Sequence, residues 1–380
     1  MRQYFRLAAA TLGSVAVVLL GVGCGSDEEG TGTASVTTAD VPQIDVELND
    51  TSGPNGEKAT PASDVQLTSK QKEELKAGDY TAALVWHVPG LFTDAATKGI
   101  KSRLKELGIE VVAETQAEGD PAKQQSDLET VLALHPDVII SIPLDPVSAA
   151  KPFRQAVQQG AKLVFLSNIP EGFKHGKDYV GIVSSDVRQM ARREAQLLAD
   201  HLGGEGKLGL ITYDADFFIT DQWDEIYRET IEKQFPGIEI VAEKGFTDPA
   251  KTEEVATAML SENPDLDALW VTWSEPAEGA LAAIRAQGRE GEVALSTVGM
   301  TESLAVDLAD EGSVFGVAVD LSSEVARTMA DEAALAVLGQ SAPAFATAGV
   351  VEVTPENVVE GWEEVYGFEA PKAVVEAAAG

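Results

Sequence analysis

From residue 79 onward, short apolar runs alternate with longer segments in which apolar residues recur every three or four positions. The apolar runs predict strands at 81–87, 110–113, 137–142, 162–167, 179–183, 207–213, 238–242, 268–273, 293–298 and 314–319. The periodic segments predict helices at 94–107, 121–134, 147–159, 187–202, 222–235, 249–261, 276–287 and 323–339. Unbroken apolar strands that alternate with amphipathic helices are typical of parallel sheets covered on both faces. The pattern therefore predicts an α/β protein.

Several landmarks of this region occur twice at a nearly constant spacing. The segment 108–114 recurs as 237–243, Asp120-Pro121 as Asp248-Pro249, Pro136-Asp137 as Pro264-Asp265, and Asp145-Pro146 as Glu275-Pro276. A period this long exceeds the roughly 20–50 residues of solenoid repeats. It predicts two similar domains, one that begins near residue 80 and one that begins near residue 186.

The N-terminus has the pattern of an export signal. Arg2 and Arg6 precede an uncharged stretch at 7–23, and Cys24 follows it. This layout predicts a signal peptide at 1–23. Small residues before a lone cysteine resemble the lipobox of bacterial lipoproteins, which implies cleavage before Cys24 and lipidation of its side chain; the departure is Gly21, where leucine is usual. A plain cleaved signal and an uncut membrane anchor remain the alternatives.

The segment 24–78 differs in composition from the rest of the chain. Gly, Ser, Thr, Asp, Glu and Pro dominate it, and no apolar period is sustained. Such a segment does not bury enough apolar surface to offset the entropy of ordering it. We therefore expect a flexible tether that is dispensable for ligand binding.

Charge and cysteine content exclude several classes. The chain has 62 acidic and 28 basic residues, for a net charge of −34. Phosphate binding needs clustered Lys and Arg, so nucleic acid is not an expected partner. Repulsion from anionic lipid leaves the lipid anchor as the expected route to a membrane. The single cysteine excludes an intrachain disulfide and a cysteine-based zinc site.

The sequence lacks several common catalytic motifs. The segment 204–209 fits GxGxxG, but it lies between a helix and the next strand, whereas a dinucleotide site follows a strand and opens a helix. The four histidines have no metal-ligand spacing. No Walker, GxSxG or HExxH motif occurs. We therefore expect no enzyme activity, no metal and no cofactor.

Ligands of parallel α/β sheets bind beyond the carboxyl ends of the strands. Trp86, Trp223 and Trp273 stand at or beside such ends in a chain with 6% aromatic residues. Trp suits a site where an apolar face meets a partly polar ligand. The alternative is that these side chains close the tops of the domains as core residues.

The region from about 80 to 352 resembles the type I periplasmic binding proteins of ABC importers, in the ribose- and simple-sugar-binding group. The resemblance rests on the segments 84–99, 142–146, 184–186 and 272–280 in this order. It implies two Rossmann-like domains with parallel sheets, joined by a hinge of three crossings near Ser185, Asp320 and Ala342. The N-terminal domain is then 79–185 plus 321–342, and the C-terminal domain is 186–320 plus 343–380.

The resemblance also implies a set of ligand contacts in an interdomain cleft: Trp86, Phe92, Thr93, Asp145, Ser167, Asn168, Trp223, Trp273, Glu275, Thr301 and Asp320. Phe92 matches an aromatic residue that stacks on the sugar. Ribose binders usually have Asp and Arg at the positions of Ser167 and Asn168, Arg near Trp223, Asn at Trp273, Asp at Thr301 and Gln at Asp320. These departures put ribose itself in doubt, and a less hydroxylated or cationic ligand is an alternative.

The sequence thus predicts a solute-binding lipoprotein that captures a small sugar or sugar-like ligand and delivers it to an ABC permease. The expected location is the cell envelope, either at the outer face of the cytoplasmic membrane or in the periplasm, and we expect a monomer. The alternative function is a sensor or signalling receptor for a non-sugar molecule, including an amine.

Overall fold

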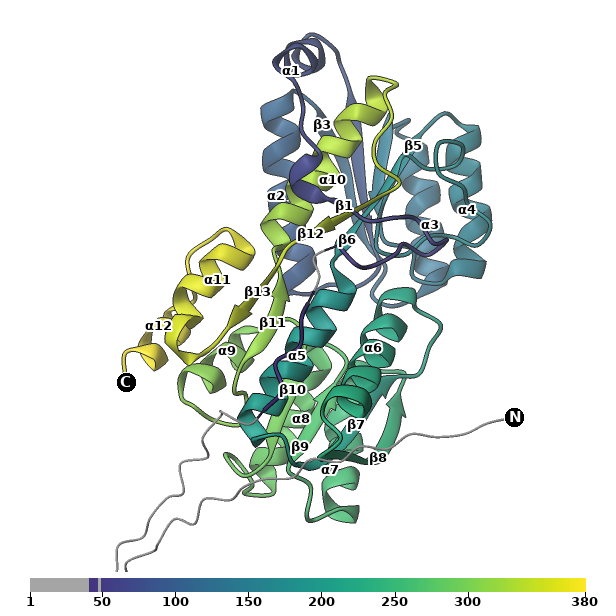
Figure 1. Ribbon diagram of the computed structural model, residues 1–380. Helices are drawn as coiled ribbons and strands as arrows, with labels where there is room; N and C mark the ends of the chain where they lie inside the picture. The colour runs from purple at the N-terminus through teal and green to yellow at the C-terminus, as the bar shows by residue number, and fades with distance from the viewer. Residues whose placement is uncertain (1–40, 47–48) are drawn as a thin grey trace, which may run out of the picture. The chain divides into compact units, whose positions relative to one another are not determined.

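The computed structural model describes residues 41–46 and 49–380 (Figure 1). The expected signal peptide at 1–23 and the lipidated Cys24 lie outside these residues. Within the described ranges, no helix is long and apolar enough to cross a membrane.

The larger sheet has seven strands in the described part of the chain, and all neighbours in it are parallel. In spatial order they are β1 (Thr60–Pro61), β12 (Phe345–Ala348), β6 (Gly181–Ser185), β5 (Lys162–Leu166), β4 (Val138–Ser141), β2 (Thr81–Trp86) and β3 (Glu110–Gln116). The central strands are buried over almost their full length, as their apolar composition requires.

Helices cover both faces of this sheet (Figure 1). They are α1 (Ser69–Lys76), α2 (Leu91–Leu107), α3 (Pro121–Leu132), α4 (Pro146–Gln158) and α10 (Ser322–Val337), with a short 3-10 turn at Ala62–Asp64. The helix α10 packs on α2 and on β4, β5 and β6, whereas α3 packs on α4 and on β2 and β3. We call residues 51–185 and 322–348 the N-lobe.

The second sheet has four parallel strands in the order β10 (Ala294–Thr297), β9 (Ala268–Val271), β7 (Gly206–Tyr213) and β8 (Ile238–Phe246). A separate antiparallel pair joins β11 (Val317–Asp320) and β13 (Val350–Val353). The accompanying helices are α5 (Val187–Leu202), α6 (Phe218–Gln234), α7 (Thr252–Glu262), α8 (Ser274–Ala286), α9 (Glu302–Ala309), α11 (Val358–Tyr366) and α12 (Lys372–Ala378), with 3-10 turns at Pro249–Lys251 and Pro355–Asn357. We call residues 186–320 and 350–380 the C-lobe.

The internal repeat is visible in both lobes. The recurring segments form β3 and β8, which are the end strands of their sheets, and each pairs with its neighbour through a register shift. Asp120 and Asp248 each cap the helical turn that begins at the following proline, and each side chain accepts a hydrogen bond from the backbone two residues on. The GxGxxG segment follows a helix stop and leads into β7, because Gly203 ends α5 in the left-handed conformation with φ of 67° and β7 begins at Gly206.

The third crossing lies later in the chain than the sequence predicts. β12 pairs with β6 inside the N-lobe sheet, and β13 pairs with β11, so the chain leaves the N-lobe at Gly349. The expected crossing at Ala342 is therefore wrong, and 343–348 belongs to the N-lobe. The apolar pattern around residue 345 is too short to identify a strand by periodicity alone.

The expected flexible tether at 24–78 is also wrong for its described part. Residues 60–61 add β1 to the edge of the N-lobe sheet, and residues 69–76 form α1. Val65, Leu67 and Leu75 are buried in the core. The segment is polar by composition, yet it docks a few apolar side chains on a surface that the rest of the chain supplies.

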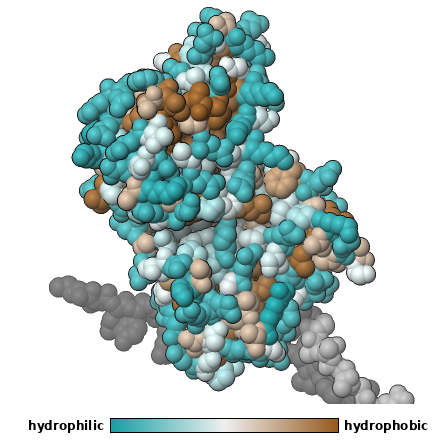
Figure 2. Space-filling view, turned by 180° about the vertical axis from the view of Figure 1, so that it is seen from behind, coloured by the Kyte–Doolittle hydropathy of each residue, from teal (hydrophilic) through white to brown (hydrophobic). Residues whose placement is uncertain are grey.

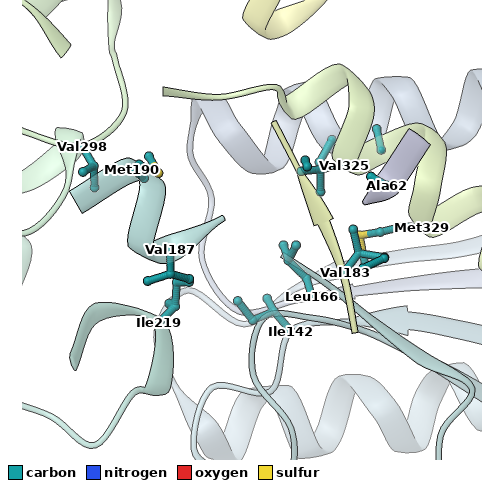
Figure 3. Close-up of a cluster of buried hydrophobic side chains, with 14 of the residues drawn as sticks. Ala62, Ile142, Leu166, Val183, Val187, Met190, Ile219, Val298, Val325 and Met329 are labelled. Atoms are coloured by element: carbon teal, nitrogen blue, oxygen red, sulfur yellow. The ribbon is translucent and has the colours of Figure 1, made fainter. Parts of the chain in front are cut away.

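One apolar cluster continues from lobe to lobe. It includes Leu84 and Ile140 of the N-lobe together with Leu208 and Trp270 of the C-lobe. Figure 3 shows where the two lobes meet within this cluster: Val187 and Ile219 of the C-lobe lie beside Ile142 and Leu166 of the N-lobe. On the outside, the face in Figure 2 is mostly hydrophilic with a few hydrophobic patches, as the high net charge leads one to expect.

Candidate functional site

The loops that follow the strands of the two sheets touch one another. Asn168, after β5, accepts a hydrogen bond from the backbone N–H of Ile219 at 3.3 Å. The ring of His87, after β2, stacks on Phe217 with 5.8 Å between centroids and 9° between planes. A side chain at Gly90 would come within 2.7 Å of the Glu275 carboxylate. The carboxyl ends of both sheets therefore face a common region, which is where open parallel sheets bind ligands.

On the N-lobe side, Phe92 and Thr93 lie in the first turn of α2. Phe92 is half-buried, and Thr93 is buried with its hydroxyl donating to the Gly90 carbonyl at 2.9 Å. Trp86 is different, because its side chain is fully buried in the core at the end of β2. Its Nε1 has no hydrogen-bond partner among the described residues. Trp86 is thus placed as a core residue, in line with the alternative that the sequence left open.

Ser167 and Asn168 form the sharp turn after β5. Ser167 has φ of 54°, the left-handed region in which non-glycine residues are uncommon. Its hydroxyl lies 3.0 Å from that of Ser184, and both residues of the turn are buried. The turn points Asn168 at the C-lobe, where its side-chain oxygen receives the Ile219 N–H.

On the C-lobe side, Trp273 belongs to an aromatic cluster. It makes an edge contact with Tyr213 and a tilted contact with Phe246, each at 5.2 Å between centroids. Tyr213 in turn meets Phe217 at 6.4 Å. Trp273 is only half-buried, so one part of the ring supports the cluster and another part is free to contact a ligand.

Trp223 and its neighbour Asp224 lie in α6. Trp223 is half-buried, and its Nε1 has no hydrogen-bond partner among the described residues. Asp224 accepts hydrogen bonds from Trp270 Nε1 at 2.7 Å and from the Thr272 hydroxyl at 2.9 Å. Burial raises the pKa of Asp224 to about 7 despite these bonds. Asp224 therefore holds the end of β9 in place beside the site.

Two of the expected contacts use their oxygens to cap helices. The Asp145 carboxylate accepts the Ser148 N–H at 2.6 Å at the start of α4. Thr301 accepts the Leu304 N–H at 3.3 Å at the start of α9 and donates to Glu278 at 2.6 Å. Thr301 is buried, and both hydrogen-bonding roles of its hydroxyl are taken, whereas Asp145 is half-exposed and keeps a second carboxylate oxygen.

Asp320 and Glu275 are carboxylates that can still accept further hydrogen bonds. Asp320 is 8% exposed, and within the described residues its carboxylate has a hydrogen bond only with its own backbone and no cationic partner. Within the described residues, Glu275 accepts from the Ser274 hydroxyl at 3.3 Å and from its own backbone. Burial raises the pKa of both groups, that of Asp320 to about 6. The pKa of the Tyr366 phenol is raised by burial and also by the charges of both carboxylates, so Asp320 and Glu275 both lie near Tyr366.

Asn168, Phe92, Trp273, Glu275 and Asp320 therefore come from the elements that meet between the lobes. His87, Phe217 and Asp224 also take part in the contacts around this region, but they are not among the ligand contacts expected from the sequence. The position of His87 directly after an apolar strand is a sequence pattern that indicates a strand-end residue. The partners of Asp224 are distant in sequence, so no local pattern reveals them. Among the described residues, no cluster of three or more His, Cys, Asp or Glu side chains is arranged to hold a metal.

Comparison with known proteins points to one family. The sequence profile described as a periplasmic binding protein domain matches residues 82–341. The D-ribose/D-allose-binding protein of Pseudomonas aeruginosa is 28% identical over 246 residues, which cover 64% of this chain and 75% of that protein. The ABC transporter periplasmic-binding protein YphF of Escherichia coli is 23% identical over 232 residues, covering 60% and 70% of the two chains.

Solved structures show the same fold. An ABC transporter solute-binding protein from Agrobacterium vitis bound to α-D-tagatopyranose superposes with a TM-score of 0.70 at 20% identity, over 77% of this chain and all of the other. A solute-binding protein from Mycobacterium smegmatis with bound glycerol gives a TM-score of 0.67 at 22% identity, over 74% and 96%.

Proposed function

Since the chain belongs to the periplasmic binding protein domain family, as a type I solute-binding protein of an ABC importer, we propose that it captures a small sugar or sugar-like polyol between its lobes and delivers it to an ABC import permease. The observation that supports this most is the meeting of strand-end loops from both lobes around half-buried aromatic rings and the nearly buried carboxylate of Asp320, which has no cationic partner within the described residues. Relatives named for D-ribose and D-allose, and the tagatopyranose-bound neighbour, suggest which compounds to try first.

In the proposed site, aromatic faces hold the apolar side of the ring and carboxylates accept its hydroxyls. Phe92 comes from the N-lobe and Trp273 from the C-lobe, so a ligand between them joins the lobes. Glu275 and Asp320 are acceptors that no guanidinium group of the described residues contacts, which suits hydroxyl donors. Our proposed ligand contacts are Phe92, Thr93, Asn168, Trp223, Trp273, Glu275 and Asp320, with Asp145 and Ser167 as secondary contacts. Trp86 is left out because its side chain is buried in the core, and Thr301 because its hydroxyl already makes its hydrogen bonds within the protein.

Binding would act by shifting the balance between open and closed lobes. A ligand moves this equilibrium only by its difference in affinity for the two states, and a shift from 1:99 to 99:1 needs about 5.5 kcal/mol. A few hydrogen bonds at about 1 kcal/mol each and an aromatic stack supply that amount. The closed form is then the one that the permease recognises. The residues perform no bond-breaking step in this scheme, so the protein is a binder and not an enzyme.

We further propose that the protein acts at the cell envelope as a monomer tethered through Cys24. The uncharged run before this residue and the family's extracytoplasmic function support the assignment. Mass spectrometry of the native N-terminal peptide tests it: a lipid mass on Cys24 is expected, and an intact Met1 or a bare Cys24 thiol contradicts it.

A thermal-shift screen of pentoses, hexoses and polyols tests the function, because a compound that binds only the folded state raises the melting temperature. Calorimetric titration of the best compound with Phe92→Ala and Trp273→Ala should then show affinities reduced about tenfold or more, since each variant loses an aromatic stack and its buried area.

Phe315→Ala is the matched control for these variants. Phe315 is also half-buried, but it stacks on His201 at 4.5 Å, at the far end of α5 from the strand-end loops. Its affinity should equal that of the wild type. Unchanged affinity in both Phe92→Ala and Trp273→Ala would overturn the proposed site. A screen in which no compound stabilises the protein would overturn the proposed function.

A further inference from the structure

Residues 41–46 and 49–67, which we call the strap and no longer count with the N-lobe, are bound to both lobes. Residues 41–46 lie along α5 of the C-lobe. Gln43 donates to Asp200 at 3.1 Å, and the Ile44 N–H donates to Gln196 at 2.9 Å. The Val41 side chain is 8% exposed and packs in the core cluster that contains α5. This end of the strap therefore moves with the C-lobe.

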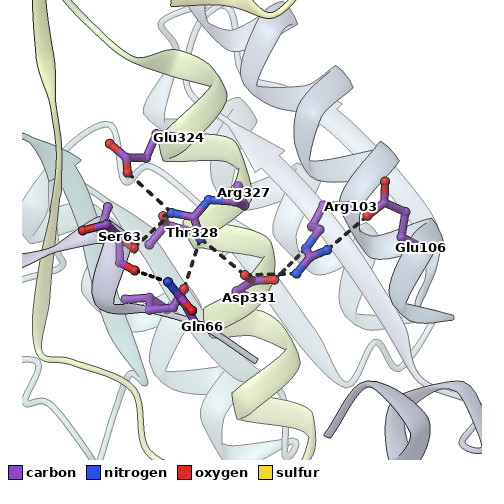
Figure 4. A network of polar contacts seen from close by, with 10 residues as sticks. Ser63, Gln66, Arg103, Glu106, Glu324, Arg327, Thr328 and Asp331 are labelled. Carbon is purple, nitrogen blue, oxygen red and sulfur yellow. Dashed lines mark hydrogen bonds and ion pairs between the residues drawn. The ribbon is translucent and has the colours of Figure 1, made fainter. Parts of the chain in front are cut away.

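The later part of the strap is fastened to the N-lobe. The Tyr179 hydroxyl donates to Glu57 at 2.6 Å, and Asn55 donates to the Phe173 carbonyl at 3.3 Å. The Arg327 guanidinium of α10 donates to the carbonyls of Ala62 at 3.0 Å and Val65 at 3.1 Å. Figure 4 shows Arg327 inside a wider polar network that continues through Asp331 to Arg103 of α2.

Asn49 connects the strap to two of the three hinge crossings. Its backbone N–H donates to the carboxylate of Asp186, the residue between β6 and α5, at 2.5 Å. Its side-chain oxygen accepts from the Thr347 hydroxyl of β12 at 2.7 Å, two residues before the crossing at Gly349. Asn49 has φ of 58°, and Asn is among the few non-glycine residues that tolerate this region. The next residue, Asp50, pairs with Arg188 of α5 at 3.6 Å.

The lobes are held in an arrangement in which the strand-end loops touch, as the Asn168–Ile219 and His87–Phe217 contacts record. We propose that Asn49 is a positioning residue for lobe closure: through Asp186 and Thr347 it ties the strap to both sides of the hinge and favours this closed arrangement. The inference rests on the proposed function, because closure matters there for holding a ligand. Asn49 lies at the hinge and acts through the crossings, not by contact with the ligand.

The proposal predicts a modest but specific effect. One hydrogen bond that is present in the closed arrangement and lost on opening changes the closed-to-open ratio about fivefold. The ligand affinity should change by the same factor where the closed state is the minor one before binding.

Asn49→Gly removes the acceptor for Thr347 while it keeps the N–H to Asp186 and the left-handed backbone. Thr347→Val removes the same bond from the other side at nearly constant shape, together with the longer contact of the hydroxyl to the Thr60 carbonyl at 3.4 Å. Asn55→Gly is the matched control, because Asn55 is in the strap but its recorded partners lie in the strap and the N-lobe.

The measurement is the distance distribution between spin labels at Val147→Cys and Glu232→Cys in the full chain without ligand. Both positions are exposed, one on each lobe, and a Cys24→Ser background removes the chain's one cysteine. We expect Asn49→Gly and Thr347→Val to shift the distribution toward longer distances by similar amounts, with no further shift when they are combined. Asn55→Gly should match the wild type.

D-ribose is the probe for affinity in the same variants. We expect Kd to rise by up to about fivefold for Asn49→Gly, and by less where the closed state is already well populated without ligand, with no rise for Asn55→Gly. Wild-type distances in Asn49→Gly, or an equal shift in Asn55→Gly, would overturn the proposal. Distances that lengthen only in Asn49→Gly and Thr347→Val support it whether or not D-ribose binds. A protein that binds no sugar at all counts against the proposed function alone.

Discussion

Asp320 ends β11 with a nearly buried carboxylate that, among the described residues, has a hydrogen bond only with its own backbone. Its neighbours differ in this respect: Asp145 caps a helix, and Asp224 accepts two side-chain donors. A buried carboxylate whose acceptor sites are mostly unfilled costs stability, so it is expected where a ligand supplies the missing donors. At the residue scale, we therefore expect Asp320 to be the side chain that contributes most to the pH dependence of binding.

Sugar affinity should fall as the pH falls through about 6, since burial raises the pKa of Asp320 to about that value and the protonated acid is a weaker acceptor. Calorimetric titration at pH 5, 6 and 7.5 measures this. Asp320→Asn should bind more weakly at pH 7.5 and show a smaller pH dependence; the remainder would come from Glu275, whose pKa is also raised by burial. Equal pH dependence in the wild type and in Asp320→Asn would remove Asp320 from the site.

At the scale of elements, α5 connects to two strands of the C-lobe through Glu194. This buried carboxylate accepts the Ser296 hydroxyl at 2.9 Å, the Thr297 N–H at 3.3 Å and the Ala318 N–H at 2.8 Å. The first two donors belong to β10 and the third to β11. One side chain thus links the last strand of the sheet to the strand that leads into the hinge.

Burial raises the pKa of Glu194 from 4.5 to about 8, although its hydrogen bonds act in the opposite direction. The folded state therefore holds a proton that the unfolded state releases, and stability should decrease as pH rises from about 4.5 to about 8. Urea unfolding at pH 5 and pH 8 measures the difference. Glu194→Gln cannot ionise, so the loss between these pH values should be smaller. A loss of the same size in both proteins would show that other groups cause it.

At the scale of the whole molecule, residues 49–78 belong to the folded body. Val65, Leu67 and Leu75 are buried, and each buried aliphatic side chain contributes about 1.5–3 kcal/mol. A chain that begins at residue 79 should therefore be less stable than one that begins at residue 41 by about 5 kcal/mol, a large part of the 5–15 kcal/mol of a typical protein.

Denaturant unfolding of the two shortened chains and the full chain checks this expectation. The chain that begins at residue 41 serves as the control, because it keeps every described contact of the strap. Coincident unfolding midpoints for all three would mean that residues 49–78 add nothing to the stability of the body.

The sequence alone determined most of the elements and the class of fold. The strand predicted at 81–87 is β2, the helix predicted at 187–202 is α5, and the recurring Asp-Pro pairs cap matching turns in both lobes. These features are readable because they depend on local causes: the alternation of apolar runs, helix caps and glycine stops lie within a few residues of the structures that they specify.

Only the tertiary structure decided which strand-end residues face the other lobe, where the chain crosses at Gly349, and how the strap is held. Trp86 and Trp273 look alike in sequence, yet one is buried in the core and the other is half-exposed between aromatic rings. Asn49 acquires its role from Asp186 and Thr347, which are far away along the chain. The physical reason is that burial and hydrogen bonding depend on partners brought together by folding, and a polar segment becomes ordered when distant residues supply its acceptors and its apolar surface.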